Sequence, residues 1–343
     1  MKSETVVAVV IPFYQREQGI LPRALKSVLS QTVGENIRFR IVIVDDESPV
    51  PPDTETIEQK LPGRHNVEIV KQKNGGPGAA RNRALDMLDP DEVDFVAFLD
   101  SDDEWQPNHI RDAIDALSAS PEHGFYFCDH TRFNTTRSWF EESELFQKWK
   151  SGEREPAPLA VAGLEQVFVL PSDDAFSAFL EEYLSQTSTV VYRFPPNAQA
   201  RFDTELRSAG EDHMLWITIA RDTNVVFSAK RNVACGQGVN VYFSAFDWDL
   251  PQTAERYGYL VLFLTKVARN FQLTGEDAQV IDDRLTKFSK VYAYLLGRNL
   301  LKGRKPNSTI LGKISRLDPK RVLSLPALFV IMLKERRSGN WDW

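Results

Sequence analysis

A cluster of aspartates directly after a short apolar run is the part of this sequence best suited to chemistry. The run is residues 95–99 (FVAFL), and the aspartates are Asp100, Asp102 and Asp103. Such a run is typical of a buried strand, and open α/β sheets bind ligands beyond the carboxyl ends of their strands. Mg²⁺ and Mn²⁺ prefer oxygen ligands and are often held by one or two carboxylates together with substrate phosphates. The cluster therefore indicates a metal–diphosphate site; the alternative is an acidic turn in which an aspartate caps the following helix.

A second pair of carboxylates, Asp45 and Asp46, follows another apolar run, residues 39–44. A carboxylate accepts hydrogen bonds from a base N–H or from ribose hydroxyls, so one member of this pair could bind a nucleoside. The alternative is a turn formed with Ser48 and Pro49. Two acidic strand ends in one α/β unit are more specific than one, and they favour a nucleotide ligand.

A glycine-rich turn, residues 75–78 (GGPG), lies between the two acidic pairs and precedes a helix that carries Arg81. It is not a Walker loop, because the Gly-Lys-Ser/Thr ending is missing, and it is not a dinucleotide fingerprint, because it follows the third expected strand. Arg81 could reach a phosphate or the nucleotide from the first turn of this helix. The alternative is an ordinary surface arginine.

Strands and helices are expected to alternate over about the first 130 residues, which predicts a mostly parallel sheet with helices on both faces. Residues 135–170 are polar and acidic and contain two prolines, so we expect a variable insertion or loop there. From residue 252 onward the pattern is helical. Strands are expected at 5–11, 39–44, 67–70, 95–99, 125–128, 187–192 and 225–229, and helices at 21–31, 79–88 and 107–117.

Charge is distributed unevenly along the 343 residues, a length that suits about two domains. The net charge is −7, yet residues 298–337 carry +9, so the remainder carries −16. A basic segment that also contains many apolar residues predicts an anionic partner, a membrane surface or nucleic acid. Nucleic acid is disfavoured because no aromatic stacking pattern accompanies the charge. The other alternative is a helical subdomain with a solvated basic face.

Cys128 and Cys235 are the only cysteines, which cannot form a disulfide framework and suit a reducing compartment. We find no signal-peptide pattern and no apolar run of the ~18 residues that would span a bilayer. The expected location is therefore cytoplasmic, with peripheral attachment at the inner face of the cytoplasmic membrane through the basic tail.

Five motifs, in this order and spacing, resemble those of family 2 inverting glycosyltransferases. They are residues 9–14 (VVIPFY), 27–32 (SVLSQT), 43–48 (IVDDES), 76–82 (GPGAARN) and 98–103 (FLDSDD). The resemblance implies the GT-A nucleotide-diphospho-sugar fold, an α/β domain with a mostly parallel sheet. It implies a catalytic domain at 1–250, followed by a helical region at 251–343 with the basic amphipathic tail.

The resemblance also implies roles for individual residues. Those expected to bind the nucleotide-sugar are Pro12, Tyr14, Asp46, Arg81, Asp100 and Ser101, with Asp46 on the base. Asp102 is expected to hold Mn²⁺ or Mg²⁺. Asp103 is the second candidate, because the two adjacent aspartates allow the family motif to be aligned one residue later.

Family members need a general base, and residues 210–213 (GEDH) match that element. Asp212 is the expected base, because a carboxylate within hydrogen-bond reach of an acceptor hydroxyl can take its proton during attack. Glu211 is expected to orient Asp212 or to bind the acceptor. The alternative for Asp212 is a helix N-terminal residue that satisfies backbone N–H groups.

The resulting prediction is a metal-dependent hexosyltransferase that uses a UDP-sugar such as UDP-glucose. Its acceptor is expected to be a hydroxyl of a lipid-linked glycan in bacterial exopolysaccharide or surface-polysaccharide biosynthesis. One alternative is a nucleotidyltransferase, although residues 12–16 lack the glycine-rich loop that such an enzyme would need after its first strand. The other is an inactive sugar-nucleotide or glycan-binding module, against which the presence of both Asp102 and Asp212 argues.

Overall fold

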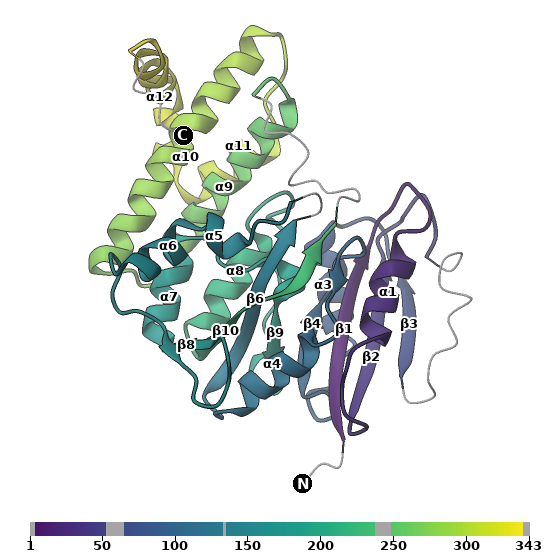
Figure 1. Ribbon diagram of the computed structural model, residues 1–343. Coiled ribbons are helices and arrows are strands. Elements are labelled where there is room, and N and C mark those ends of the chain that lie inside the picture. The colour runs from purple at the N-terminus through teal and green to yellow at the C-terminus, as the bar shows by residue number, and fades with distance from the viewer. Residues whose placement is uncertain (1–3, 53–64, 133–134, 237–247, 339–343) are drawn as a thin grey trace. The chain divides into compact units, whose positions relative to one another are not determined.

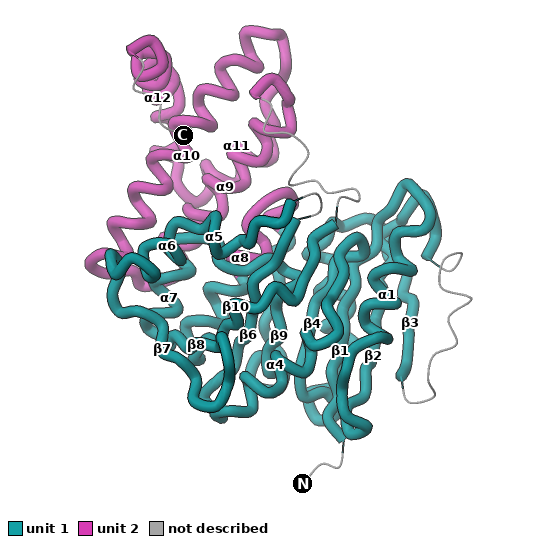
Figure 2. Tube along the Cα trace, in the orientation of Figure 1, with its two compact units in different colours: residues 1–204, 215–240 teal, residues 205–214, 241–343 magenta. Residues whose placement is uncertain are grey.

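The computed structural model describes residues 4–52, 65–132, 135–236 and 248–338. The chain divides into two compact units: residues 1–204 with 215–240, and residues 205–214 with 241–343 (Figure 2). The first unit contains the sheet and the second contains the C-terminal helices, and each is described by itself below.

The first unit is built on one mixed, mostly parallel sheet with the strand order β3-β2-β1-β4-β9-β6-β10-β8-β7, in which β5 also pairs with β10 (Figure 1). Strands β3, β2, β1 and β4 are parallel neighbours, whereas β9 runs antiparallel between β4 and β6. The strands are β1 (Thr5–Phe13), β2 (Ile37–Asp45), β3 (Asn66–Lys71), β4 (Phe95–Phe98), β5 (Glu104–Trp105), β6 (His123–Arg132), β7 (Leu159–Ala160), β8 (Val167–Leu170), β9 (Val191–Arg193) and β10 (Asn224–Cys235). The predicted α/β class is confirmed.

Helices cover both faces of the sheet, which explains why its strands β1 and β4 are almost entirely apolar. Val7, Val9 and Ile11 of β1 pack in one core with residues of α1 and α4. On the opposite face, Trp216 of α8 lies 5.7 Å from Phe98 between ring centroids. The helices of this part of the chain are α1 (Leu21–Leu29), α3 (Pro77–Leu85), α4 (His109–Ser118), α5 (Trp139–Glu142), α6 (Glu144–Ser151), α7 (Ser172–Glu181) and α8 (Glu211–Ala220).

The expectation of a loop over residues 135–170 is wrong. This stretch forms α5, α6, β7 and β8. Its helices are short but well capped: Ser138 and Glu141 form a capping box, and Ser143 caps α6. Phe140 and Phe146 stack with ring centroids 3.7 Å apart. The average composition of this stretch is polar, but the burial of a few large apolar residues determines its structure.

The strand expected at 187–192 is also different, because Thr187–Thr189 forms a short 3-10 helix, η1, before β9. The difference matters for the site, since Ser188 of η1 forms hydrogen bonds with Asp100 and Asp103.

The second unit consists of the segment 205–214 and the helices α9 (Pro251–Asn270), α10 (Gly275–Leu301), α11 (Ser308–Leu317) and α12 (Pro319–Arg337). The segment is tied to α9 by an ion pair between Lys266 Nζ and Glu205 Oε2 at 2.6 Å. Close packing also requires glycine here: a Cβ at Gly210 would lie 2.8 Å from Phe263. Within the described ranges, none of the helices combines the length and the apolar composition needed to cross a bilayer.

Candidate active site

The carboxyl ends of β1, β2 and β4 meet at one edge of the sheet, because the three strands are parallel and adjacent. Phe13 pairs with Asp45, and Val10 pairs with Phe98, so the residues after each strand lie next to one another. A side-chain hydrogen bond joins two of these strand ends directly: Gln15 Nε2 donates to Ser101 Oγ at 2.9 Å. The edge therefore gathers both acidic pairs of the sequence.

Asp46 holds the glycine-rich turn in place. Its Oδ1 accepts hydrogen bonds from Gln72 Nε2 at 2.7 Å and from the Gly75 N–H at 2.8 Å, and its Oδ2 accepts one from the Gly76 N–H at 2.8 Å. Gly76 has φ +89°, a backbone conformation that favours glycine, and it directly precedes α3. Asp46 and the glycine turn, which are about 30 residues apart in the sequence, therefore form one structure.

Its neighbour Asp45 forms a turn with Ser48, which was the alternative role considered for Asp45 and Asp46. Asp45 Oδ1 accepts a hydrogen bond from the Ser48 N–H at 2.8 Å. Pro12 and Tyr14, at the end of β1, are half-buried and so remain accessible at the same edge.

Arg81 is not a surface residue, because it is only 3% exposed. Its Nη2 forms an ion pair with Asp100 Oδ1 at 2.6 Å, and its guanidinium lies 5.2 Å from the centre of the Phe202 ring. A buried arginine needs such a partner to offset its loss of hydration. Arg81 thus fixes the position of the first aspartate of the cluster.

Asp103 is the most deeply buried carboxylate of the cluster and is held by three internal donors. Ser188 Oγ donates to its Oδ2 at 2.6 Å, Gln186 Nε2 to the same oxygen at 3.1 Å, and the Gly236 N–H to its Oδ1 at 2.7 Å. Burial raises the pKa of Asp103 well above its usual value, and the negative charges of Asp102 and Asp100 raise it further. Asp103 connects the end of β4 to η1 and to the end of β10.

Asp102 differs from Asp103 in being half-buried, so its carboxylate borders the accessible side of the edge. The alternative role for these aspartates, as caps of the next helix, is not observed: α4 has Asn108 at its N-cap. Within the residues that the structure describes, no three or more His, Cys, Asp and Glu side chains are arranged to hold a metal ion. A metal at this edge would thus depend on few protein ligands, as is common for Mg²⁺ bound with substrate phosphates.

Gly236 is required at its position by the close approach of the aspartate turn. A Cβ placed there would lie 1.7 Å from the Asp102 carbonyl oxygen, which is backbone and cannot rotate away. We expect Gly236→Ala to displace the turn, to lower the free energy of unfolding by about 1–3 kcal/mol and to weaken nucleotide binding. Gly312→Ala in α11 is the matched control, because no atom lies within 4 Å of its added Cβ.

The readouts are urea unfolding and a nucleotide titration of both variants. Wild-type behaviour of Gly236→Ala in both would show that the aspartate turn does not depend on this approach.

Glu211 and Asp212 lie in the first turn of α8 and belong to the second unit. Asp212 Oδ1 accepts a hydrogen bond from the His213 N–H at 2.7 Å. His213 itself is buried, and its ring stacks on Phe263 at 4.8 Å. This position agrees with a residue that satisfies backbone N–H groups at a helix N-terminus, and it agrees equally with a general base.

Sequence reasoning did not connect Gln15, Gln186 and Ser188 with this cluster. Gln15 follows β1 and donates to Ser101, whereas Gln186 and Ser188, at η1, donate to Asp103. The contacts of Ser188 and Gln186 with Asp103 span more than 80 residues of chain. Neither residue carries a local signal that would associate it with Asp103, so only the folded chain reveals them.

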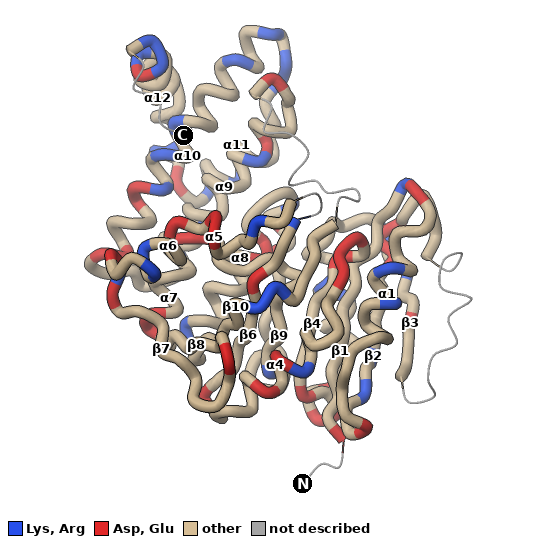
Figure 3. Tube along the Cα trace, in the orientation of Figure 1, with Lys and Arg blue, Asp and Glu red and all other residues tan. Residues whose placement is uncertain are grey.

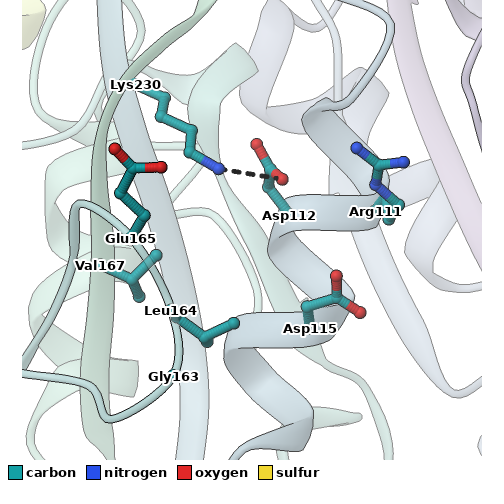
Figure 4. Close-up of a pocket in the computed structure, with 8 residues that line it drawn as sticks. All are labelled: Arg111, Asp112, Asp115, Gly163, Leu164, Glu165, Val167 and Lys230. Carbon is teal, nitrogen blue, oxygen red and sulfur yellow. Dashed lines mark hydrogen bonds and ion pairs between the residues drawn. The ribbon is translucent and has the colours of Figure 1, made fainter.

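A cavity of about 450 Å³ lies elsewhere in the first unit (Figure 4). It is lined by α4, β10 and the 163–167 segment, and Lys230 Nζ pairs with Asp112 Oδ1 there at 3.4 Å. None of the predicted site residues lines it. The cavity is therefore distinct from the strand-end edge.

Comparison with known proteins identifies the family of this chain. The model of Glycosyl transferase family 2 matches residues 8–164. The Succinoglycan biosynthesis protein ExoW of Rhizobium meliloti (strain 1021) is 33% identical over 253 residues, which are 72% of this chain and 73% of ExoW. This chain belongs to glycosyl transferase family 2. The family match includes Asp46 and the Asp100–Asp103 cluster at the strand ends, and Arg81 on α3.

Solved structures of glycosyltransferases share the fold of this family 2 member. The Staphylococcus aureus TarS 1–349 structure in complex with UDP-GlcNAc aligns with a TM-score of 0.59 at 17% identity, covering 97% of this chain and 92% of that one. The mannosyltransferase PcManGT of Pyrobaculum calidifontis, in complex with GDP-Man and Mn²⁺, aligns with a TM-score of 0.53 at 15% identity, covering 96% and 86%. At these identities the likeness establishes the GT-A type of fold.

Proposed function

We propose that this family 2 member is a metal-dependent inverting glycosyltransferase that transfers a hexose from a UDP-sugar to a hydroxyl group of a glycan. The observation that carries the proposal is the meeting of Asp46, the glycine turn, Arg81 and the aspartate cluster at one edge of the parallel sheet. Parallel α/β sheets bind nucleotides at such an edge. The UDP-GlcNAc complex of TarS supports a UDP-sugar as donor.

In this proposal the nucleoside lies between the ends of β1 and β2, with Pro12 and Tyr14 on one side and Asp46 on the other. Asp46 retains lone pairs beside its three internal hydrogen bonds and can accept another from a base N–H. Arg81 positions Asp100, and Gln15 positions Ser101. Asp100 and Ser101 would then bind the ribose and the diphosphate.

The residues at the edge fit a divalent cation. Three carboxylates lie within four residues. Burial raises the pKa of Asp103, and the negative charges of Asp102 and Asp100 raise it further. A bound cation would favour the charged form of these carboxylates. Asp102 would hold the metal, since Asp103 is already engaged by three donors. Bound Mg²⁺ or Mn²⁺ would offset the charge that develops on the leaving diphosphate.

Asp212 is proposed as the general base and Glu211 as a residue that orients it or binds the acceptor. Inversion requires the acceptor hydroxyl to attack the anomeric carbon from the face opposite the diphosphate. The hydroxyl proton passes to the Asp212 carboxylate, the bond from the hydroxyl oxygen to the sugar forms, and the bond from the sugar to the diphosphate breaks.

The acceptor is proposed to be a lipid-linked glycan in polysaccharide biosynthesis, reached at the inner face of the cytoplasmic membrane. Support comes from ExoW, whose name assigns it to succinoglycan biosynthesis, and from the +9 charge of residues 298–337. In the same proposal residues 1–250 form the catalytic domain and residues 251–343 a helical region.

The test is the stereochemistry of donor hydrolysis, followed in real time by proton NMR with Mg²⁺ and an α-linked UDP-hexose. Water takes the place of the glycan acceptor, and an inverting enzyme releases the β-sugar first, before mutarotation mixes the anomers. Initial release of the α-sugar would contradict inversion. The absence of hydrolysis with every UDP-hexose tried would contradict the donor class.

A further inference from the structure

Apolar side chains are exposed in one region of the second unit far more than elsewhere. Among the described residues, seven large apolar side chains are exposed: Leu159, Leu250, Leu300, Leu301, Leu323, Val330 and Ile331. Five of them, Leu300, Leu301, Leu323, Val330 and Ile331, lie at the end of α10 or on α12, and we name these five the C-terminal patch. Scattered exposed leucines need no explanation, but a contiguous group indicates an interaction surface.

The patch on α12 follows the spacing of one helix face. Leu323, Val330 and Ile331 are 80%, 49% and 42% exposed, and they are separated by seven or eight residues, which is two helical turns. Leu325 and Met332 point to the other side and are buried. Helix α12 is therefore apolar on two faces, and only one of them is covered by its own unit.

Both parts of the patch lie on helices that pack against each other, α10 and α12. Lys290 Nζ pairs with Glu335 Oε1 at 2.7 Å, and further along α10 a Cβ at Gly297 would lie 2.3 Å from the Phe329 ring. The two contacts follow opposite orders along the two helices, so α10 and α12 pack with opposite chain directions where they touch. Leu300 and Leu301 follow Gly297 at the end of α10, and Leu301 is the most exposed of the five at 82%.

Cations surround the patch. Lys320 and Lys334 are exposed on α12, each three residues from a patch member and on the same helix face, and Arg337 is exposed one turn further on. Figure 3 shows lysine and arginine along α12 and at the end of α10. The arrangement is an apolar strip framed by positive charge, rather than a charged face with isolated apolar residues.

We propose that the C-terminal patch docks on an anionic membrane surface, with α12 lying in the plane of the interface. Apolar side chains would enter the boundary between headgroups and acyl chains, and the lysines would remain at the level of the anionic headgroups. Each basic residue near such a surface adds to the attraction. A second copy of the chain is a poorer occupant, because two identical patches would bring their lysines together.

The docking proposal rests on the patch and not on the transfer reaction, although it would place the proposed enzyme where a lipid-linked acceptor is found. The two can fail separately, because vesicle binding and hydrolysis of a soluble UDP-sugar are different measurements.

The experiment is co-sedimentation of the full chain with phosphatidylcholine vesicles that contain or lack phosphatidylglycerol. We expect binding to the anionic vesicles that weakens as salt is raised. The double variant Leu323→Ser/Ile331→Ser should lower the partition coefficient at least about tenfold, since each buried apolar side chain contributes substantially to insertion. Leu159→Ser, at an exposed leucine of β7 in the first unit, is the matched control and should bind as the wild type does.

Hydrolysis of the soluble donor should be unchanged in all three proteins, which shows that the patch variants are folded. Failure of the wild type to sediment with anionic vesicles would overturn the proposal, as would equal binding by the double variant. A dimer in solution that the double variant dissociates would assign the patch to a second copy instead.

Discussion

Asp212→Asn is expected to lower the rate of sugar transfer by about 10²–10⁴-fold while leaving donor binding close to that of the wild type. Asparagine matches the size of aspartate and can still occupy the first turn of α8, where Asp212 accepts a hydrogen bond from the His213 N–H. It cannot accept the proton of the acceptor hydroxyl. Donor hydrolysis and calorimetric titration with the UDP-sugar measure the two effects separately.

Glu211→Gln is the neighbouring control for Asp212→Asn. It removes one negative charge from the same helix turn. If Glu211 only orients the base or binds the acceptor, Glu211→Gln should lower the rate of sugar transfer less than Asp212→Asn does. An Asp212→Asn variant that transfers sugar normally would contradict the assignment. One that loses stability and donor binding to the same extent as activity would show that Asp212 serves the helix terminus instead.

Asp102→Asn is the second change with a large expected effect. Loss of this carboxylate should weaken metal-dependent donor binding by about 10–100-fold, because amide oxygen is a neutral ligand and the site has few protein ligands to compensate. The half-buried position of Asp102 means that the substitution removes little packing. The readout is the affinity for the UDP-sugar at several Mn²⁺ concentrations, in which the variant should need more metal than the wild type.

Asp103→Asn separates this account from its nearest alternative, in which Asp103 is the metal ligand. The amide group introduced by this substitution would face the donors whose hydrogen bonds the Asp103 oxygens now accept, from Ser188, Gln186 and Gly236. A buried donor left without an acceptor costs about 1–3 kcal/mol, so the main loss should be in the free energy of unfolding. If Asp103→Asn kept the stability of the wild type but its affinity for the UDP-sugar no longer depended on metal, Asp103 would be the metal ligand instead.

The parallel half of the fold could be predicted because its signals are local. The apolar runs of β1, β2 and β4 are nearly continuous, which is what burial on both faces requires, and each ends in the polar residues that form the site. Parallel pairing then forces those ends to one edge. The fold class and the grouping of Asp46 with Asp100 follow from this.

What the sequence did not reveal depends on contacts between distant residues. Gln15 meets Ser101 across 86 positions, and Asp103 meets Gly236 across 133. The inclusion of residues 205–214 with the C-terminal helices depends on pairs such as Lys266 with Glu205. The helices of the 135–170 stretch were missed for a different reason, because a few buried aromatic residues determine its structure while its average composition is polar.

The most direct test of the central claim is a calorimetric titration of the unmodified chain with UDP-, GDP- and dTDP-sugars, with Mn²⁺, with Mg²⁺ and with chelator. We expect saturable binding of a UDP-sugar with either metal and loss of that binding with chelator. Absence of binding to any nucleotide-sugar under every metal condition would contradict it, and the Asp100–Asp103 cluster would then be an acidic turn.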